Sequence, residues 1–181
     1  MTCMEGPSLR LRPATADDAA ARFLLGHNPE IVRMFGVSHA GAKPMTMDAA
    51  EAWALAHAAN PYVWIIEVGG QLIGEIKLHS VNAQDRRAST AIAIYDAQQL
   101  GKGYGSEAIR LLLHHAFTEL DLHRIGIRVL AYNERAIRAY LKCGFVVEGR
   151  ERETAFVDGV WHDDLMMGIL SRDFKGRGRS G

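Results

Sequence analysis

Residues 98–108 read Gln98-Gln99-Leu100-Gly101-Lys102-Gly103-Tyr104-Gly105-Ser106-Glu107-Ala108, and they join a strand-like run to the longest helix-like run of the chain. The three glycines stand at alternate positions, and without a Cβ they let backbone N–H groups turn inward toward one point. A helix that begins directly after them adds its unpaired N-terminal N–H groups and the positive end of its dipole. The pattern predicts a loop that holds an anion, with phosphate or pyrophosphate as the natural ligand.

Two better-known glycine motifs do not match this loop. A P-loop needs a further glycine upstream and Ser or Thr after its Gly-Lys pair, but Lys102 is followed by Gly103. A dinucleotide-binding fingerprint has a small residue where Ser106 stands and normally lies in the first strand–helix unit of a doubly wound sheet. This loop lies past the middle of the chain. Both alternatives are therefore disfavoured.

The segments before the loop predict a meander of antiparallel strands. Two apolar, β-branched runs cover residues 62–68 and 71–79, and the Gly69-Gly70 pair between them is typical of a two-residue hairpin. Residues 87–95 form the next strand, and residues 8–12 form a short strand near the start of the chain. Capping residues and apolar spacing predict helices over residues 15–25, 29–35 and 46–58.

Beyond the loop, the sequence predicts a strand–helix–strand crossover and a final hairpin. A long amphipathic helix follows the loop, and residues 124–130 then form a strand that can lie parallel to residues 87–95. Residues 145–157 and 160–170 alternate around Asp158-Gly159, a strong hairpin pattern. The expected fold class is therefore α+β, with a mixed, mostly antiparallel sheet and one central parallel pair.

Composition narrows the class of protein. A chain of 181 residues is expected to form one domain over residues 1–170, followed by a disordered basic tail over residues 171–181. Lys plus Arg and Asp plus Glu both number 21, so no net charge would draw the protein to nucleic acid or to an anionic membrane. Cys3 and Cys143 make no disulfide framework, and no signal peptide or membrane span is recognised, so we expect a cytoplasmic location. The eight histidines show no metal-ligand spacing, and no metal is predicted.

A helix expected between Asn133 and Gly144 carries the second candidate motif. Its residues Asn133, Ala136, Ile137 and Tyr140 fall on one face, because seven residues make about two helical turns. A phenol that points into a cleft can give its proton to a departing anion, whereas a phenol that points into the core only packs. The spacing alone favours packing in the core.

Taken together, the two motifs resemble the GNAT superfamily of acyl-CoA-dependent N-acyltransferases. The loop matches the family pattern Gln/Arg-x-x-Gly-x-Gly/Ala as Gln98-x-x-Gly101-x-Gly103. The helix matches the family's asparagine, tyrosine and Gly-Phe set as Asn133-x-x-Ala136-x-x-x-Tyr140-x-x-x-Gly144-Phe145. The resemblance covers about residues 9–170 and implies a GNAT-like sheet whose central parallel strands splay apart, with helices on both faces. The ending, Asp158-Gly159-x-Trp161-x-Asp163, resembles the branch of ribosomal-protein N-terminal acetyltransferases and spermidine N-acetyltransferases.

The resemblance also implies a cofactor and a set of site residues. Acetyl-CoA would be the co-substrate, and an amine would attack its thioester directly. Tyr140 would be the general acid, and Asn133 would bind the cofactor arm or nearby backbone. Further cofactor-binding residues implied by position are Ile92, Ala93 and Ile94 along the arm, Leu100, Gly101, Lys102, Gly103, Tyr104 and Gly105 around the pyrophosphate, and Ala136, Ile137 and Lys142 on the helix. For Lys102, Arg138 and Lys142 an ordinary solvated surface remains an equal alternative to a phosphate contact.

The general base is less determined by the sequence. Glu75 alternates with Ile73 and Lys77 in the run 71–79, so it either faces the cleft as a base or pairs with a cation, and pairing is favoured. Members of the resembled branch often carry an acid early in the strand before the glycine loop, where this chain has Ala88-Ser89-Thr90. That departure favours a water molecule as the group that removes the proton of the amine, with the water relayed to the backbone or to Glu75.

The acceptor is the least determined feature. We expect it to enter near residues 28–35, Tyr62, Trp161 and Asp163. Residues 34–47 contain no acid, which disfavours a polyamine and leaves a small-molecule amine or a protein N-terminus. The main hypothesis is an acetyl-CoA-dependent N-acetyltransferase, and the alternative is a sensory module that binds CoA without turnover. A homodimer through the final hairpin is a further expectation, which sedimentation tests.

Overall fold

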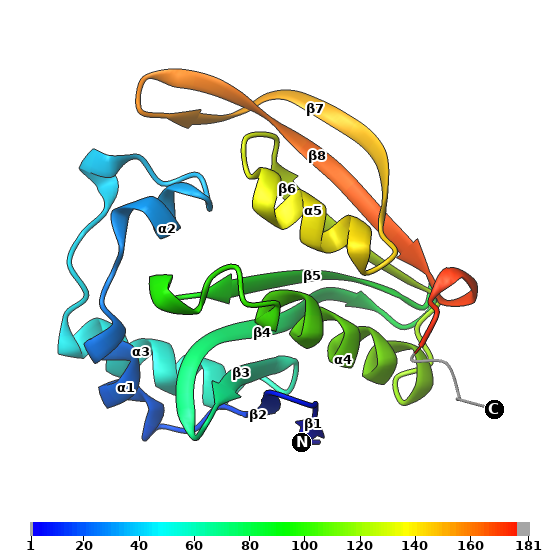
Figure 1. Cartoon of the computed structure of the whole chain (residues 1–181), viewed down its shortest axis with the longest axis horizontal. Coiled ribbons are helices and arrows are strands. Elements are labelled where there is room, and N and C mark those ends of the chain that lie inside the picture. Colours follow the sequence, from blue (N-terminus) through cyan, green and yellow to red (C-terminus); the bar gives the residue numbers. More distant parts are fainter. Residues whose placement is uncertain (1, 177–181) are drawn as a thin grey trace.

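The computed structural model describes residues 2–176, which build one eight-stranded sheet in the order β1-β2-β3-β4-β5-β6-β8-β7 (Figure 1). The strands are β1 (Met4–Glu5), β2 (Arg10–Pro13), β3 (Val63–Val68), β4 (Gln71–Asn82), β5 (Arg87–Ile94), β6 (Arg124–Leu130), β7 (Val146–Val157) and β8 (Val160–Leu170). Only β5 and β6 pair in parallel, and all other neighbours are antiparallel. The expected α+β class and its single parallel pair are confirmed.

Both predicted hairpins form, and their turn residues explain why. Gly69 and Gly70 have φ values of 57° and 79°, and Asp158 and Gly159 have values of 50° and 81°. Two successive positive φ angles belong to the tight turn that matches the twist of antiparallel strands, and glycine adopts them without a Cβ penalty.

Helices cover both faces of the sheet, as expected. They are α1 (Asp18–Leu25), α2 (Pro29–Arg33), α3 (Met47–Ala58), α4 (Tyr104–Thr118) and α5 (Glu134–Lys142), with short 3-10 turns η1 (His39–Gly41), η2 (Ala97–Gln99) and η3 (Ser171–Asp173). Alternation along β3 sends Trp64 and Ile66 into the larger core with α4 and α5, and Ile65 into a smaller core with α1 and α3. All three residues are at most 1% exposed, so both faces of the sheet are buried from solvent at this strand.

The parallel pair separates soon after it forms. Register between β5 and β6 runs only from Arg87 opposite Arg124 to Ser89 opposite Gly126. Farther along, β5 stays paired with β4 and β6 stays paired with β8, so the two halves of the sheet diverge. The expected splay is confirmed. It leaves the β6-facing backbone groups in the second half of β5 without a strand partner.

Two local features differ from what the sequence predicts. The two-residue strand β1 was not predicted, because it is too short for an alternating pattern to show. The domain continues past residue 170, since Ser171–Asp173 form η3 and the Phe174 ring lies 5.5 Å from that of Phe117. The remainder of the expected disordered tail, residues 177–181, lies outside the described residues.

Candidate active site

Three neighbouring cavities lie where β5 and β6 diverge. Their volumes are about 150, 300 and 420 Å³, and Phe35 and Ile92 line all three. We call them the loop cavity, the α1-side cavity and the β6-side cavity. The loop cavity is lined by Ile31, Met34, Phe35, Ile92, Ile94, Leu100, Gly103, Gly105, Ser106, Ile109, Asn133, Arg135, Ala136, Ala139 and Tyr140. One continuous cleft therefore runs from the glycine loop through the split in the sheet.

The glycine loop is shaped to receive an anion. Gly101 and Gly103 have φ values of 77° and 89°, and Gly103 is the N-cap of α4 without a side-chain cap. A Cβ built at Gly101, Gly103 or Gly105 meets no protein atom within 4 Å, and Gly103 and Gly105 line the loop cavity, so open space adjoins the loop. The free N–H groups of the first turn of α4 point into that space with the positive end of the helix dipole. A pyrophosphate fits this charge and this geometry.

Tyr140 reaches the cleft from α5. Its side chain lines both the loop cavity and the β6-side cavity, and the residue is 7% exposed. Burial raises the pKa of Tyr140 to about 12, with a smaller contribution from Cys143. The phenol is therefore protonated at neutral pH and available as a proton donor.

The rest of the α5 motif divides between cleft and surface. The Asn133 side chain lines the cleft and caps the helix, accepting a hydrogen bond from the Ala136 N–H at 3.3 Å. Ala136 also lines the loop cavity, whereas Ile137 packs against the main core. Lys142 lies in the last turn of α5 and lines none of the three cavities.

Side chains along β5 alternate between the two sides of the cleft. Ile94 lines the loop cavity and Ala93 the α1-side cavity, while Ile92 lines all three cavities. On the loop itself, Lys102 donates a hydrogen bond from Nζ to Gln99 Oε1 at 3.1 Å. The exposed Arg138 side chain pairs with Glu134 at 3.1 Å on the surface of α5.

Glu75 lies on β4 at the α1-side cavity, with its carboxylate surrounded by donors. Trp53 Nε1 donates to Oε2 at 3.0 Å, His57 Nε2 lies 2.5 Å from the same oxygen, and Lys77 Nζ lies 3.7 Å from Oε1. Burial alone would raise the pKa of Glu75, but the His57 hydrogen bond and the nearby cations outweigh it and hold the pKa below its ordinary value. The carboxylate is thus kept charged and in place.

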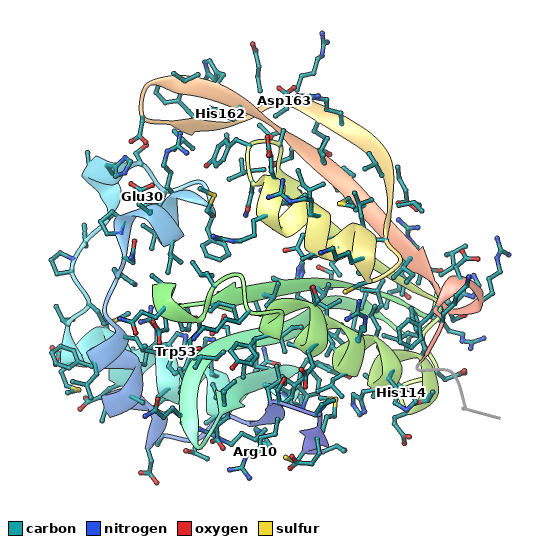
Figure 2. All side chains as sticks on the ribbon, in the orientation of Figure 1. Arg10, Glu30, Trp53, His114, His162 and Asp163 are labelled. Atoms are coloured by element: carbon teal, nitrogen blue, oxygen red, sulfur yellow. The ribbon has the colours of Figure 1, made fainter. Side chains whose placement is uncertain are left out.

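Sequence reasoning missed four side chains around that carboxylate. Trp53 and His57 come from α3, Arg22 from α1 and Tyr95 from the end of β5 (Figure 2 labels Trp53). Trp53 and His57 stand at positions i and i+4, with ring centres 4.4 Å apart, and this spacing was the one available clue. Their shared partner could not be read from local spacing.

The structure brings only some of the residues expected near the acceptor to the cleft. Asn28, Ile31, Val32 and Phe35 line the α1-side cavity as expected for residues 28–35. Tyr62, Trp161 and Asp163 line none of the three cavities. Asp163 instead accepts from Arg150 Nε at 2.6 Å, on the outer hairpin where Figure 2 labels it.

The β7–β8 hairpin closes the far end of the cleft. It arches over α5 toward α2 in Figure 1, and Asp158 at its tip accepts hydrogen bonds from Arg33 Nε at 3.1 Å and from the His39 backbone N–H at 2.8 Å. Asp158 N–H donates to Ser38 Oγ at 2.9 Å. The hairpin tip and the α2–η1 segment are therefore joined across the cleft.

Residues 8–146 match the family model described as Acetyltransferase (GNAT) domain. This match spans more than half of the chain and includes the glycine loop and the α5 motif. The chain belongs to the GNAT acetyltransferase family. Membership confirms the resemblance read from the two motifs.

Relatives of this GNAT protein include enzymes named for two kinds of acceptor. The Escherichia coli K12 spermidine N(1)-acetyltransferase is 28% identical over 167 residues, which cover 92% of this chain and 88% of that protein. YdaF of Bacillus subtilis, provisionally named a ribosomal N-acetyltransferase, is 34% identical over 108 residues. That match spans 59% of this chain and only 58% of YdaF.

A solved structure agrees with the fold along nearly the whole chain. Spermidine N-acetyltransferase from Vibrio cholerae, determined in complex with CoA and spermine, superposes with a TM-score of 0.78 at 28% identity. The superposition covers 93% of this GNAT chain and 98% of that protein. Among residues 2–176, no helix is both long enough and apolar enough to cross a membrane.

Proposed function

We propose that this protein transfers the acetyl group of acetyl-CoA to a primary amine by direct attack. One observation carries the proposal: the buried Tyr140 phenol lines the cleft at the split between β5 and β6, beside the glycine loop. A proton donor, an anion cradle and an unpaired strand edge thereby meet in one place. Their combination suits the departure of a thiolate from an extended thioester.

The loop and β5 would hold acetyl-CoA. The pyrophosphate binds the N–H groups from Leu100 to Gly105, where open space and the α4 dipole favour an anion. The pantetheine arm lies along the unpaired edge of β5 near Ile92 and Ile94, as an added strand would. Asn133 and Ala136 form the opposite wall of the loop cavity.

The transfer exchanges a C–S bond for a C–N bond. The amine attacks in its neutral form, and backbone N–H groups of β5 stabilise the oxyanion that develops on the thioester carbonyl. Tyr140 gives its proton to the departing thiolate. Glu75 receives the proton of the amine through water, since it is the carboxylate that lines the α1-side cavity.

Acetyl transfer is tested directly by following release of CoA thiol from acetyl-CoA across a panel of amino acids, small amines, polyamines and peptides. We expect turnover with at least one primary amine and a product that is heavier by one acetyl group. CoA binding by calorimetry, without turnover on any member of the panel, would instead identify the sensory module.

Replacing Glu75 with Gln is expected to affect both rate and stability. Loss of the base lowers kcat by roughly 10- to 100-fold and removes the acid limb of the pH–rate profile, while CoA affinity stays unchanged. Removing the charged acceptor of the buried Trp53 hydrogen bond costs roughly 1.5–3 kcal/mol at pH 7. Because the folded pKa of Glu75 lies below its ordinary 4.5, this stabilisation is present above about pH 4.5 and lost as the pH falls through the folded pKa.

The two readouts of the Glu75→Gln variant separate its roles. Chemical denaturation from pH 3 to pH 7 should show a steeper loss of stability in the wild type than in the variant. If kcat of the variant still falls at low pH as it does in the wild type, Glu75 is not the base. Its role is then to hold Trp53 and His57 in position.

A homodimer is also part of the proposal. β7 is an edge strand, and exposed apolar side chains gather on its hairpin, namely Val146, Val147, Phe156, Val160 and Trp161. An unpaired, partly apolar edge of this length is a template for another strand. A second copy would cover it, and sedimentation velocity at micromolar concentration tests this against a monomer.

A further inference from the structure

Arg22 is buried beside the α1-side cavity, and no carboxylate among residues 2–176 forms an ion pair with it, although the charge of Glu75 lies near enough to act on it. The residue is 3% exposed, and its guanidinium carbon lies 4.0 Å from the ring centre of Tyr95 and 5.8 Å from that of Trp53. Nη1 donates a hydrogen bond to the Gly26 carbonyl oxygen at 2.8 Å. The buried Nε has no hydrogen-bond partner in the part of the chain that the structure describes.

The Tyr95 side chain, one backbone hydrogen bond and the more distant charge of Glu75 act on Arg22, but none of them is a carboxylate in direct contact with its guanidinium. Glu75, the carboxylate that shares the cavity, is paired with His57 and Lys77 instead. Burial lowers the pKa of Arg22, yet a guanidinium stays protonated in proteins. A buried cation without an anion is costly, and such groups concentrate at functional sites.

The electrostatic character of the cavity follows from its lining. Its titratable lining residues are Arg22, His27, Glu75, Lys77 and Tyr95. The carboxylate of Glu75 already receives the Trp53 N–H and lies beside two basic side chains, so it offers little to a further cation. Arg22 and Lys77 therefore give the cavity a net attraction for a negative group.

We propose that Arg22 binds a carboxylate carried by the acceptor amine, so that the acceptor is an amino acid or a peptide N-terminus with a nearby carboxylate. This rests on the proposed acetyl transfer. The carboxylate lies on the α1 side against Arg22, and the amine points past Ala93 and Ile92 toward the split between β5 and β6. In this arrangement the ligand supplies the directly contacting carboxylate that residues 2–176 do not, through hydrogen bonds in which both partners are charged.

The same lining makes a polyamine a poor acceptor. A polycation needs several free carboxylates, and Glu75 is the one carboxylate among the described residues that line this cavity. The spermidine enzymes are therefore guides to the fold and the cofactor cleft, while Arg22 is the feature of this chain that sets its acceptor.

The experiment compares acceptors that differ only in the carboxylate. Free amino acids are measured against their carboxamides, and peptides beginning Ala-Asp against peptides beginning Ala-Asn, with a diamine as reference. We expect kcat/KM of the wild type to favour the carboxylate form by about 10- to 100-fold. Preference confined to free amino acids identifies the α-carboxylate, and preference confined to the peptides identifies the side chain.

Substitution then assigns the preference to Arg22. In Arg22→Gln the carboxylate form loses about 10- to 100-fold in kcat/KM, and the carboxamide form changes less than threefold. Arg22→Lys keeps the charge and should retain part of the preference for the carboxylate form. This variant allows the same comparison if Arg22→Gln folds poorly. Arg152→Gln, an exposed change on β7, is the matched control and leaves the ratio intact. The carboxylate and carboxamide acceptors differ in the basicity of their amines. This difference cancels when the ratio of their kcat/KM values is compared between wild type and variant.

The outcomes separate the two proposals. If no amine on the panel is acetylated, the proposed function fails. If amines are acetylated with equal efficiency whether or not they carry a carboxylate, or if the preference survives in a folded Arg22→Gln protein that binds CoA normally, acetyl transfer stands and the role of Arg22 is overturned.

Discussion

Replacing Tyr140 with Phe lowers kcat by about 100- to 1000-fold and leaves the affinity for CoA within twofold of the wild type. The hydroxyl is lost, but the ring keeps its place 6.0 Å from that of Phe145. Without the phenol, no side-chain donor at this point of the cleft protonates the departing thiolate. Single-turnover thiol release measures the chemical step, and calorimetry measures CoA binding.

The control for this variant is Tyr62→Phe, because Tyr62 packs on the main core and lines no part of the cleft. Its turnover should equal that of the wild type. The pH profile gives a second check, since a phenol with a pKa of about 12 stays protonated through pH 10 and should impose no alkaline limb on kcat below that point. Unchanged turnover in Tyr140→Phe would reduce Tyr140 to a packing residue.

The glycine-loop side of the cleft was predictable because its determinants are local. Alternate glycines before a helix specify positive φ angles and free N–H groups within a few residues. Asn133 caps α5 and, with Ala136 and Tyr140, faces one side because of helical periodicity alone. Motifs of this kind are complete within one strand–loop–helix unit, so reading them needs no knowledge of the tertiary contacts.

The α1 side of the cleft was not predictable in the same way. Trp53 meets Glu75 only because α3 packs on the α1 side of the sheet, and Arg22 meets Tyr95 only because α1 covers the end of β5. Periodicity shows which face of an element is buried, but it does not show which partner the face meets. A buried, unpaired arginine reads as an ordinary surface residue until its neighbours are placed.

Glu107, in the first turn of α4, shows the same dependence on tertiary contacts. Its Oε1 accepts the Ser8 backbone N–H at 2.9 Å and the Leu9 N–H at 3.3 Å. The carboxylate therefore ties the N-terminal segment to α4, directly behind the glycine loop. A carboxylate in the first turn of a helix suits the helix dipole, and here a long-range contact determines what it binds.

Changing both Gly101 and Gly103 to Ala is expected to weaken CoA binding by about 100-fold. Each position has a strongly positive φ, which costs an L-residue about 1–2 kcal/mol. The alanine loop relaxes to negative φ in the free protein, because neither position is packed by neighbouring atoms. Its N–H groups then leave the anion site, and CoA binding must restore the strained form at a cost of about 2–4 kcal/mol.

The matched control is Gly69→Ala with Gly70→Ala, in the β3–β4 hairpin. These glycines have φ values of 57° and 79°, and a Cβ at either also meets no atom within 4 Å. The backbone penalty is similar, but the hairpin is held by its strands and cannot relax, so the penalty appears in unfolding instead. Calorimetry and thermal melting should therefore give opposite patterns: weak CoA binding with a nearly unchanged Tm for the loop variant, and normal CoA binding with a Tm lowered by several degrees for the hairpin variant. Equal CoA affinity in both variants would mean that the amides of this loop do not hold the pyrophosphate.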